Sequence, residues 1–336
     1  MSTRVAINGF GRVGRAAFRS AFESGADIEW VAVNDVESAD ALANVLAHDS
    51  VYGAFPAEIA VDGSAIVVDG VELPVYSAAE PTDLPWHELG VDVVLECTGR
   101  FRTRAGAAGH LTAGARKVIV SAPMKDADAT VVLGVNFPEA YDPETHAVIS
   151  NASCTTNCLA PVAKVLHDTV GIRHGQMTTI HAYTGDQRLV DTPHKDPRRA
   201  RAAALNLVPT STGAAKAIGL VIPELAGKLS GFAVRAPIPT GSIVDLTIEA
   251  QRETSVDEIN QLFRERASDV LAYSEAPIVS SDIVKSPYSA IFDAPLTGVV
   301  DGTQVKVVAW YDNEWGYSTR LVELAQRVLV PSLVTA

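Results

Sequence analysis

Cys154 is the side chain of this sequence whose surroundings best suit a nucleophile. It lies in the run SCTTN, residues 153–157, between a predicted strand and the start of a predicted helix. A thiol at a helix N-terminus has its thiolate stabilised by the helix dipole, and a neighbouring imidazole stabilises it further as an ion pair. His181, near the end of the predicted strand 176–183, is the candidate partner and base. Spacing alone leaves open that both are ordinary core residues.

The sequence contains three cysteines, and we expect the other two, Cys97 and Cys158, to be core residues. An odd, low cysteine count without a secretory signal is typical of a reducing compartment, so a cytoplasmic protein is expected. The eight histidines are scattered, and no pair stands at ligand spacing beside a cysteine or carboxylate cluster. The sequence therefore predicts no metal site.

A glycine-rich turn near the N-terminus predicts a nucleotide site. Gly9, Gly11 and Gly14 follow a predicted strand and open a helix, and Asp35 ends the next strand. In this fingerprint the first glycine makes a tight turn, the second lets the backbone approach the pyrophosphate, and the third lets the helix pack on the strand. The Asp35 carboxylate can accept from the ribose hydroxyls and would repel a 2′-phosphate, which favours NAD over NADP.

The nucleotide-site residues and the catalytic residues are expected to lie in two separate domains. A chain of 336 residues exceeds what one hydrophobic core usually serves, so two domains are expected. Residues 1–153 alternate strand and helix, which predicts an α/β, Rossmann-type NAD-binding domain with a parallel sheet. Residues 154–317 carry strands rich in β-branched and aromatic residues together with helical patterns, which predicts an α+β catalytic domain with a mixed sheet. The amphipathic segment 318–336 predicts a helix that packs back onto the first domain.

Charge and hydropathy limit the class of ligand. The formal net charge is −13, which excludes the basic footprint of a general nucleic-acid or membrane-surface binder. No run approaches the ~18 apolar residues of a membrane span. An anionic ligand must therefore be bound by a local basic site. The polar segment 184–204, rich in Arg, Asp and Pro, is too long for a plain connector and predicts a functional loop.

Several motifs occur in a fixed order along nearly the whole chain: NGFGRVGR (8–15), VND (33–35), ECTG (96–99), ASCTTN (152–157), TGAAKA (212–217) and NEWGY (313–317). Together they resemble the phosphorylating glyceraldehyde-3-phosphate dehydrogenase family. The resemblance implies an NAD-dependent enzyme of glycolysis and gluconeogenesis that converts glyceraldehyde 3-phosphate and inorganic phosphate to 1,3-bisphosphoglycerate. It implies that Cys154 attacks the aldehyde and forms a thioester, and that His181 accepts a proton as the hydride leaves for the nicotinamide.

The resemblance also assigns residues to the ligands. Arg235 serves both phosphate subsites, and Thr184 and Arg199 belong to one of them. The loop leaves Arg198 as an alternative, and Arg199 is preferred. The other subsite consists of Ser153, Thr155, Thr212 and Gly213. The residues assigned to the cofactor are Gly9, Gly11, Arg12, Val13, Gly14, Asp35, Ser121, Asn313 and Tyr317.

Some positions depart from the family pattern. Ala79 stands where many relatives have an arginine near the adenine, and Thr192 replaces a leucine common in NAD-specific members. Both leave the strictness of NAD over NADP open. Residues 184–204 resemble the family's S-loop, which reaches a neighbouring subunit's cofactor, so the resemblance implies a homotetramer.

Three alternative functions remain, two enzymatic and one non-catalytic. Erythrose-4-phosphate dehydrogenase shares the cysteine and histidine but alters the Thr-Gly phosphate element, which this chain keeps as Thr212-Gly213. A semialdehyde dehydrogenase with the same thioester chemistry is a more distant rival. A non-catalytic nucleotide-binding regulatory protein would have no need of both Cys154 and His181.

Overall fold

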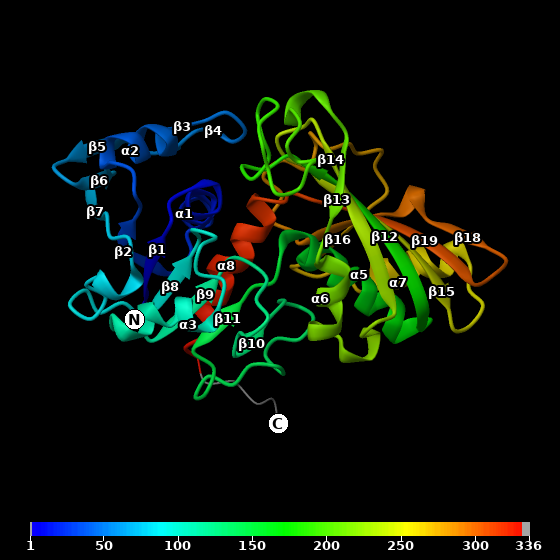
Figure 1. The fold of residues 1–336 in the computed structure, drawn as a ribbon. Coiled ribbons are helices and arrows are strands. Elements are labelled where there is room, and N and C mark those ends of the chain that lie inside the picture. The colour runs from blue at the N-terminus through cyan, green and yellow to red at the C-terminus, as the bar shows by residue number, and fades with distance from the viewer. Residues whose placement is uncertain (1, 331–336) are drawn as a thin grey trace. The chain divides into compact units, whose positions relative to one another are not determined.

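Two sheets organise the chain, each in its own compact unit. The computed structural model describes residues 2–330. One unit comprises residues 2–131, 137–152 and 318–330, and the other comprises residues 132–136 and 153–317. Figure 1 gives the course of the chain through both. No helix of the described residues is long and apolar enough to cross a membrane.

The first unit contains a nine-stranded sheet and its helices. Its elements are β1 (Thr3–Asn8), α1 (Arg12–Ser24), β2 (Ile28–Asn34), α2 (Ala39–Ala47), β3 (His48–Asp49), β4 (Gly53–Ala54), β5 (Ile59–Asp62), β6 (Ala65–Val68), β7 (Val71–Tyr76), η1 (Pro81–Asp83), β8 (Val93–Glu96), α3 (Arg104–Ala107), α4 (Gly109–Thr112), β9 (Lys117–Val120), β10 (Ala129–Thr130) and β11 (Val148–Ser150). Strand order is β10-β11-β9-β8-β1-β2-β7-β6-β5.

This sheet is parallel from β10 through β7, which confirms the α/β fold class predicted from the sequence. The expected purely parallel sheet is wrong at one edge, where β5, β6 and β7 form antiparallel hairpins. These edge strands are short, and β5 alternates only between half-buried and exposed residues. Such a segment lacks the continuous apolar run by which a buried parallel strand is recognised.

Glycines mark both ends of helix α1, which follows β1 in the chain. It begins after Gly11 and ends at Gly25, whose left-handed backbone lets its N–H bond to the carbonyls of Ala21 and Phe22. Between these ends the helix buries an apolar stripe that includes Phe18. The helix N-terminus is thereby fixed beside the carboxyl end of β1.

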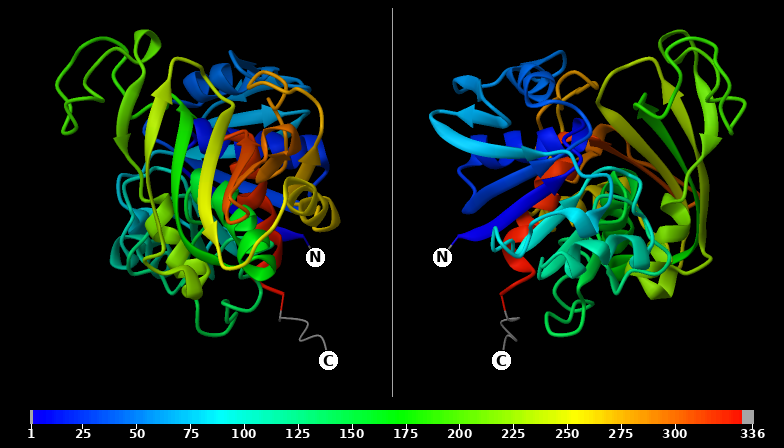
Figure 2. Two further views of the ribbon diagram at one scale, coloured as in Figure 1. Left: turned by 90° about the vertical axis from the view of Figure 1, so that its right-hand side faces the viewer. Right: turned by 60° about the vertical axis from the view of Figure 1, so that its left-hand side comes forward.

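The second unit contains a mixed eight-stranded sheet, as predicted. Its elements are α5 (Cys154–Thr169), β12 (Ile172–Ala182), η2 (Ala203–Leu205), β13 (Val208–Ser211), α6 (Ala214–Val221), η3 (Pro223–Leu225), β14 (Leu229–Ala236), β15 (Ser242–Ala250), α7 (Val256–Glu265), β16 (Leu271–Ser274), β17 (Ala290–Asp293), η4 (Ala294–Leu296), β18 (Gly298–Val300) and β19 (Gln304–Tyr311). Strand β12 pairs in parallel with β14 and antiparallel with β15. After β12 the chain forms a long loop that extends beyond the sheet in the left view of Figure 2.

The last helix, α8 (Trp315–Arg327), differs from the predicted range 318–336. It begins earlier because Oδ1 of Asp312 accepts from the N–H groups of Glu314 and Trp315. It ends at Arg327, and residues 331–336 lie outside the described residues. Ser318 Oγ donates to the carbonyl of Val13 at 3.3 Å, and the hydroxyl of Tyr141 donates to the carbonyl of Val328 at 2.7 Å. These bonds join α8 and the residues after it to the first unit.

Candidate active site

Cys154 is the first residue of α5, where the free backbone N–H groups of the helix lie. Oγ of Ser153 accepts from the N–H of Thr156 at 3.1 Å and so caps the helix. The Cys154 side chain is half-buried, whereas Cys158, one helical turn later, is fully buried. Cys158 is therefore a core residue, as expected.

The imidazole of His181, on β12, lies beside the Cys154 sulfur. Nε2 of His181 is 3.4 Å from Sγ of Cys154. Nδ1 of the same ring is 2.7 Å from the carbonyl oxygen of Ala182, which can only accept, and on this shorter of its two polar contacts we assign the ring proton to Nδ1. Nε2 therefore presents its lone pair to the thiol. The Tyr311 ring meets the imidazole edge-on, with 5.9 Å between ring centroids.

Arg235 reaches the same ring from the neighbouring strand, β14. The register of β12 and β14 pairs His181 with Arg235. Nη1 of Arg235 lies 3.0 Å from Nδ1 of His181 and donates to the carbonyl of Ala182 and to Oγ1 of Thr184. Its Nε is buried without a hydrogen-bond partner among residues 2–330. The guanidinium thus keeps a donor for a further anion.

Burial and this positive charge decide the protonation states. Desolvation, followed by the Arg235 charge, lowers the pKa of His181 to about 3, so the imidazole is neutral at physiological pH. Desolvation raises the pKa of Cys154, although Arg235 and the Thr155 hydrogen bonds oppose it. Burial thus opposes the thiolate–imidazolium pair expected from the sequence, whereas the Arg235 charge and the Thr155 hydrogen bonds favour the thiolate. The two groups are a thiol and a neutral base that is able to take its proton.

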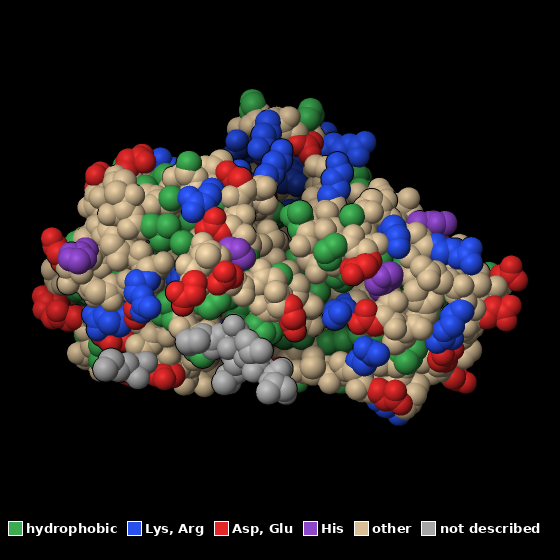
Figure 3. All heavy atoms as spheres, turned by 90° about the horizontal axis from the view of Figure 1, so that it is seen from below, with side chains coloured by type: hydrophobic (Ala, Val, Ile, Leu, Met, Phe, Trp, Pro, Cys, Tyr) green, Lys and Arg blue, Asp and Glu red, His purple; other side chains and the backbone are tan. Residues whose placement is uncertain are grey.

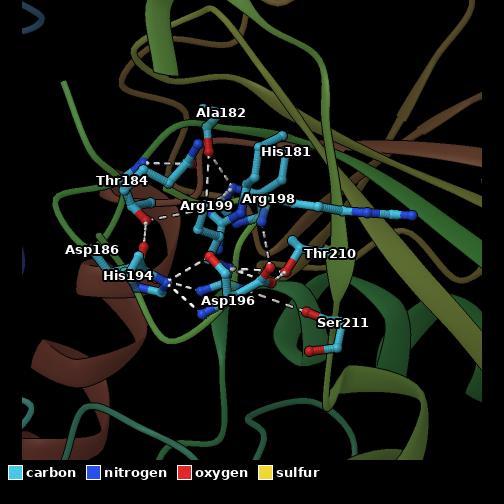
Figure 4. A network of polar contacts seen from close by, with 12 residues as sticks. His181, Ala182, Thr184, Asp186, His194, Asp196, Arg198, Arg199, Thr210 and Ser211 are labelled. Carbon is cyan, nitrogen blue, oxygen red and sulfur yellow. Dashed lines mark hydrogen bonds and ion pairs between the residues drawn. The ribbon is translucent and has the colours of Figure 1, made fainter. Parts of the chain in front are cut away.

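The loop after β12 adds a second arginine. Arg199 donates from Nε to Oγ1 of Thr210 at 2.9 Å and from Nη2 to the carbonyl of Ser211 at 3.4 Å, and its Nη1 pairs with Asp186 (Figure 4). Arg198 is exposed, and its guanidinium donates to the carbonyl of Pro209 at 3.5 Å. Of the two candidates, the structure places Arg199 in the cluster with Thr184 and Arg235.

These arginines are a local positive site in an acidic protein. The formal net charge of the chain is −13. Figure 3 nevertheless shows a face on which Lys and Arg side chains gather at the upper edge of the view, while acidic side chains are scattered over the rest. A local basic site, as the sequence requires for an anionic ligand, is compatible with this distribution.

The residues assigned to the other phosphate subsite lie at two helix starts. Ser153 and Thr155 stand at the start of α5, and Thr212 and Gly213 stand at the start of α6. Oγ1 of Thr212 accepts from the N–H of Ala214 at 3.2 Å. The hydroxyl of Thr155 is buried and lies 3.0 Å from the hydroxyl of Tyr311, so it belongs to an internal network.

Sequence reasoning missed three polar residues at this site. Tyr311 bridges Thr155 and Thr179 through its hydroxyl, and Asp186 pairs with Arg199. Oγ of Ser242 accepts from the N–H of Ala182 and donates to Oδ1 of Asn313. Asp186 could have been found as the acid that follows Thr184 in a polar loop. Tyr311 and Ser242 read as ordinary strand residues, so no local signal distinguishes them.

The predicted nucleotide site forms a pocket in the first unit. Gly9 has a φ of +92°, and a Cβ there would lie 2.7 Å from the Thr98 nitrogen. A Cβ on Gly14 would lie 2.3 Å from the carbonyl oxygen of Gly9, whereas one on Gly11 would meet nothing within 4 Å. The pocket is lined by Asn8, Gly9, Gly11, Asn34, Asp35, Val36, Ala78, Ala79, Cys97, Thr98, Arg100 and Phe101.

The carboxylate of Asp35 is fixed at this pocket, because its Oδ2 accepts from the N–H of Phe10 at 2.7 Å. The guanidinium of Arg12 pairs with Asp49, so its backbone N–H at the helix start is the group best placed for an anion. Cys97 is half-buried and lines the pocket, which corrects its expected place in the core. Open space at Gly11, a helix start without a side-chain cap and a fixed carboxylate together fit a dinucleotide.

The remaining cofactor candidates lie in both units. Ser121 follows β9, and Val13 is in the first turn of α1. Oδ1 of Asn313 accepts from Ser242 Oγ at 2.8 Å, so its amide NH₂ is the group left to bind a ligand. Tyr317 is a buried residue of α8. Among residues 2–330, no group of three or more His, Cys, Asp or Glu is arranged to hold a metal ion.

Comparison of the sequence with known protein families also indicates a nucleotide-binding domain followed by a second domain. Residues 3–104 match the model described as the glyceraldehyde 3-phosphate dehydrogenase NAD binding domain, and residues 153–313 match the C-terminal domain of the same family. The fold and these matches define an NAD-dependent dehydrogenase built from a nucleotide-binding domain and a separate catalytic domain.

Relatives match over nearly the whole chain. Glyceraldehyde-3-phosphate dehydrogenase 1 of Streptomyces avermitilis is 57% identical over 329 residues, covering 97% of this chain and 98% of the relative. The Geobacillus stearothermophilus enzyme is 56% identical with the same coverage, and that of Mycobacterium bovis is 57% identical over 338 residues, covering 98% and 99%. The chain belongs to the glyceraldehyde 3-phosphate dehydrogenase family.

Proposed function

We propose that this chain oxidises and phosphorylates glyceraldehyde 3-phosphate to 1,3-bisphosphoglycerate through a thioester on Cys154. The observation that carries the proposal is the 3.4 Å contact between Sγ of Cys154 and Nε2 of His181. A nucleophile within reach of a positioned neutral base is the arrangement that covalent catalysis requires. The names of the relatives support the choice of substrate.

The side chains define the proton path. His181 Nε2 takes the thiol proton as the sulfur attacks the aldehyde carbon, and it returns the proton to the oxyanion to form a hemithioacetal. The N–H of Cys154 at the start of α5 and the His181 ring are the donors for that oxyanion. His181 then takes the hydroxyl proton as the carbon is oxidised to a thioester. Attack by inorganic phosphate breaks the carbon–sulfur bond and restores the thiol.

The cofactor residues follow from the pocket and the family. NAD, when bound, supplies the hydride acceptor. We assign the pyrophosphate to the turn of Gly9 and Gly11 and to the start of α1, and the ribose hydroxyls to Asp35. The remaining assigned residues are Arg12, Val13, Gly14, Ser121, Asn313 and Tyr317.

The phosphate groups of the ligands are assigned to the arginine cluster and the two helix starts. Arg235 contributes an unused Nε donor, and Arg199 and Thr184 lie beside it. Guanidinium groups bind phosphate through paired charge-assisted hydrogen bonds. Ser153, Thr155, Thr212 and Gly213 make up the second subsite.

The test follows NADH formation from glyceraldehyde 3-phosphate and NAD with and without inorganic phosphate. We expect strong dependence on phosphate. A preference for erythrose 4-phosphate, or a rate indifferent to phosphate, would favour one of the rival dehydrogenases. Binding of NAD without turnover of any aldehyde would favour the regulatory alternative.

We also propose a homotetramer in the cytoplasm. The loop after β12 and the segment before β13 expose large apolar side chains: Leu189 at 80%, Val190 at 66%, Leu205 at 83% and Leu207 at 67%. Exposed apolar patches mark interaction surfaces. Coverage by another copy would agree with the S-loop role that the resemblance implies. The cytoplasmic assignment is supported by three free cysteines in the described chain.

A further inference from the structure

Asp186 is a carboxylate inside the arginine cluster, and the proposed reaction gives it no role. Its Oδ1 accepts from Oγ1 of Thr184 at 2.6 Å, and its Oδ2 pairs with Nη1 of Arg199. Figure 4 shows Asp186 next to Thr184, with a dashed line joining the two side chains. The carboxylate therefore occupies both of these donors in the ligand-free chain.

These donors are the ones that the proposed phosphate subsite needs. The Thr184 hydroxyl has one proton, which it gives to Asp186 while its oxygen accepts from Arg235 at 3.1 Å. A phosphate oxygen can bind this hydroxyl only after Asp186 releases it. Nη1 of Arg199 carries two N–H groups, and Asp186 accepts from one of them. The carboxylate and a phosphate thus compete for one set of donors.

Asp186 is not needed to hold Arg199 in place. Arg199 also donates to Thr210 at 2.9 Å and to the carbonyl of Ser211 at 3.4 Å, and it lies 3.8 Å from Asp196. Removal of the Asp186 carboxylate would therefore leave the guanidinium oriented.

Thr184 is likewise held without Asp186. Its carbonyl accepts from the N–H of Gln187 at 3.0 Å, its own N–H donates to Oε1 of Gln187, and its hydroxyl accepts from Arg235. Neither Thr184 nor Arg199 therefore needs Asp186 to hold its side chain in place.

Asp186 is ionised at neutral pH. Burial acts to raise its pKa, but the hydrogen bond from Thr184 and the charges of Arg199 and Arg235 lower it below the ordinary value. A phosphate entering this cluster therefore meets a full negative charge as well as two cations, and the like charges repel.

We propose that Asp186 is a built-in competitor at the phosphate subsite formed by Thr184, Arg199 and Arg235, and that it weakens the binding of phosphate-bearing ligands. The proposal rests on the proposed function, because that function supplies the phosphate. An enzyme gains turnover when its substrate is not bound too tightly in the ground state, and a displaceable carboxylate provides this.

The experiment titrates inorganic phosphate calorimetrically into the full-length protein with NAD present. Asp186→Asn removes the charge and keeps the shape of the side chain. Asp191→Asn is the matched control, because Asp191 lies in the same loop and pairs with Arg201 at 2.9 Å in an exposed bridge. We expect Asp186→Asn to bind phosphate about tenfold more tightly, which corresponds to about 1.4 kcal/mol. The control should stay within about twofold of wild type, since surface pairs contribute little.

A second variant, Asp186→Ala, covers the case in which the asparagine disturbs the loop, and it too should bind phosphate more tightly. If wild type binds phosphate and neither Asp186 variant binds it more tightly, the competitor role is wrong while the subsite stands. If no protein of the set binds phosphate, the subsite in the proposed function fails, and this inference fails with it.

Discussion

Two neighbouring groups determine the protonation state of the His181 imidazole. The carbonyl of Ala182, 2.7 Å from Nδ1, favours the tautomer with the proton on that nitrogen, and the Arg235 guanidinium, 3.0 Å from Nδ1, disfavours a second proton. The result is a neutral base whose lone pair faces the Cys154 thiol. The same positive charge favours the Cys154 thiolate, so its effects on the two groups oppose each other when the proton moves from Cys154 to His181.

Replacement of the nucleophile separates chemistry from cofactor binding. Cys154→Ala is expected to abolish NADH formation, because no other described thiol lies within bonding reach of His181. NAD binding should persist, since the glycine turn and Asp35 are unchanged. Steady-state assays and NAD titration by fluorescence check both parts. Turnover near the wild-type rate would refute the nucleophile assignment.

The buried imidazole also makes stability depend on pH. The pKa of His181 is lowered to about 3, below the ordinary value of ~6.5, so between these values the unfolded chain binds more protons than the folded chain. Stability is therefore lost as pH falls through this window. Relative to His181→Asn, wild type should lose about 2 kcal/mol of unfolding free energy between pH 7 and pH 5. Urea denaturation at both pH values measures the difference.

The control for this prediction is His48→Asn, which replaces an exposed histidine of the first unit. The His48 variant should lose as much stability as wild type between the two pH values. Equal pH dependence in wild type and His181→Asn would contradict the neutral, buried imidazole.

Among the secondary-structure elements, the start of α1 contains one glycine that the packing of the fold requires, Gly14, and one that is expected to matter mainly for NAD binding, Gly11. A Cβ on Gly14 would lie 2.3 Å from the carbonyl oxygen of Gly9, whereas one on Gly11 enters open space. Gly14→Ala should therefore lower stability by about 1–3 kcal/mol, as overpacking does, and weaken NAD binding.

Gly11→Ala is the matched substitution at the same turn. It should cost less than about 1 kcal/mol, the range for a changed helix cap, yet weaken NAD binding because the methyl group stands where the pyrophosphate approaches. Thermal unfolding and NAD titration of both variants test the contrast. Unchanged NAD affinity in Gly11→Ala would argue against the pyrophosphate assignment.

At the scale of the whole molecule, exposed apolar side chains predict assembly. Leu205 is 83% exposed, and it belongs to the apolar group around the loop after β12. Leu205→Glu should convert the proposed tetramer to smaller species, because a charge buried at an interface without a partner is strongly unfavourable. Sedimentation velocity measures the change in mass.

Val71→Glu provides the control, because Val71 is 69% exposed on the edge hairpin of the first unit. This variant should sediment as wild type does. A wild-type monomer, or a Leu205→Glu protein with the wild-type mass, would contradict the proposed interface.

Features that depend on local chain chemistry could be predicted from the sequence. The glycine turn, α1, Asp35 at the end of β2 and Cys154 at the start of α5 are all set by short patterns of glycines, caps and apolar periodicity. The edge hairpins of 59–76 escaped prediction because their strands are short and two of them, β5 and β7, are largely half-buried or exposed and carry little of that signal.

Contacts between residues far apart in the sequence could not be predicted, because they depend on how the sheets assemble. The register of β12 and β14 sets Arg235 against His181, and the loop after β12 turns Arg199 inward beside Asp186 while Arg198 stays exposed. Burial, which no local pattern specifies, then makes Cys154 a thiol and His181 a neutral base. Protonation depends on the desolvation and charge that surrounding residues impose, and those residues are brought together only when the sheet forms.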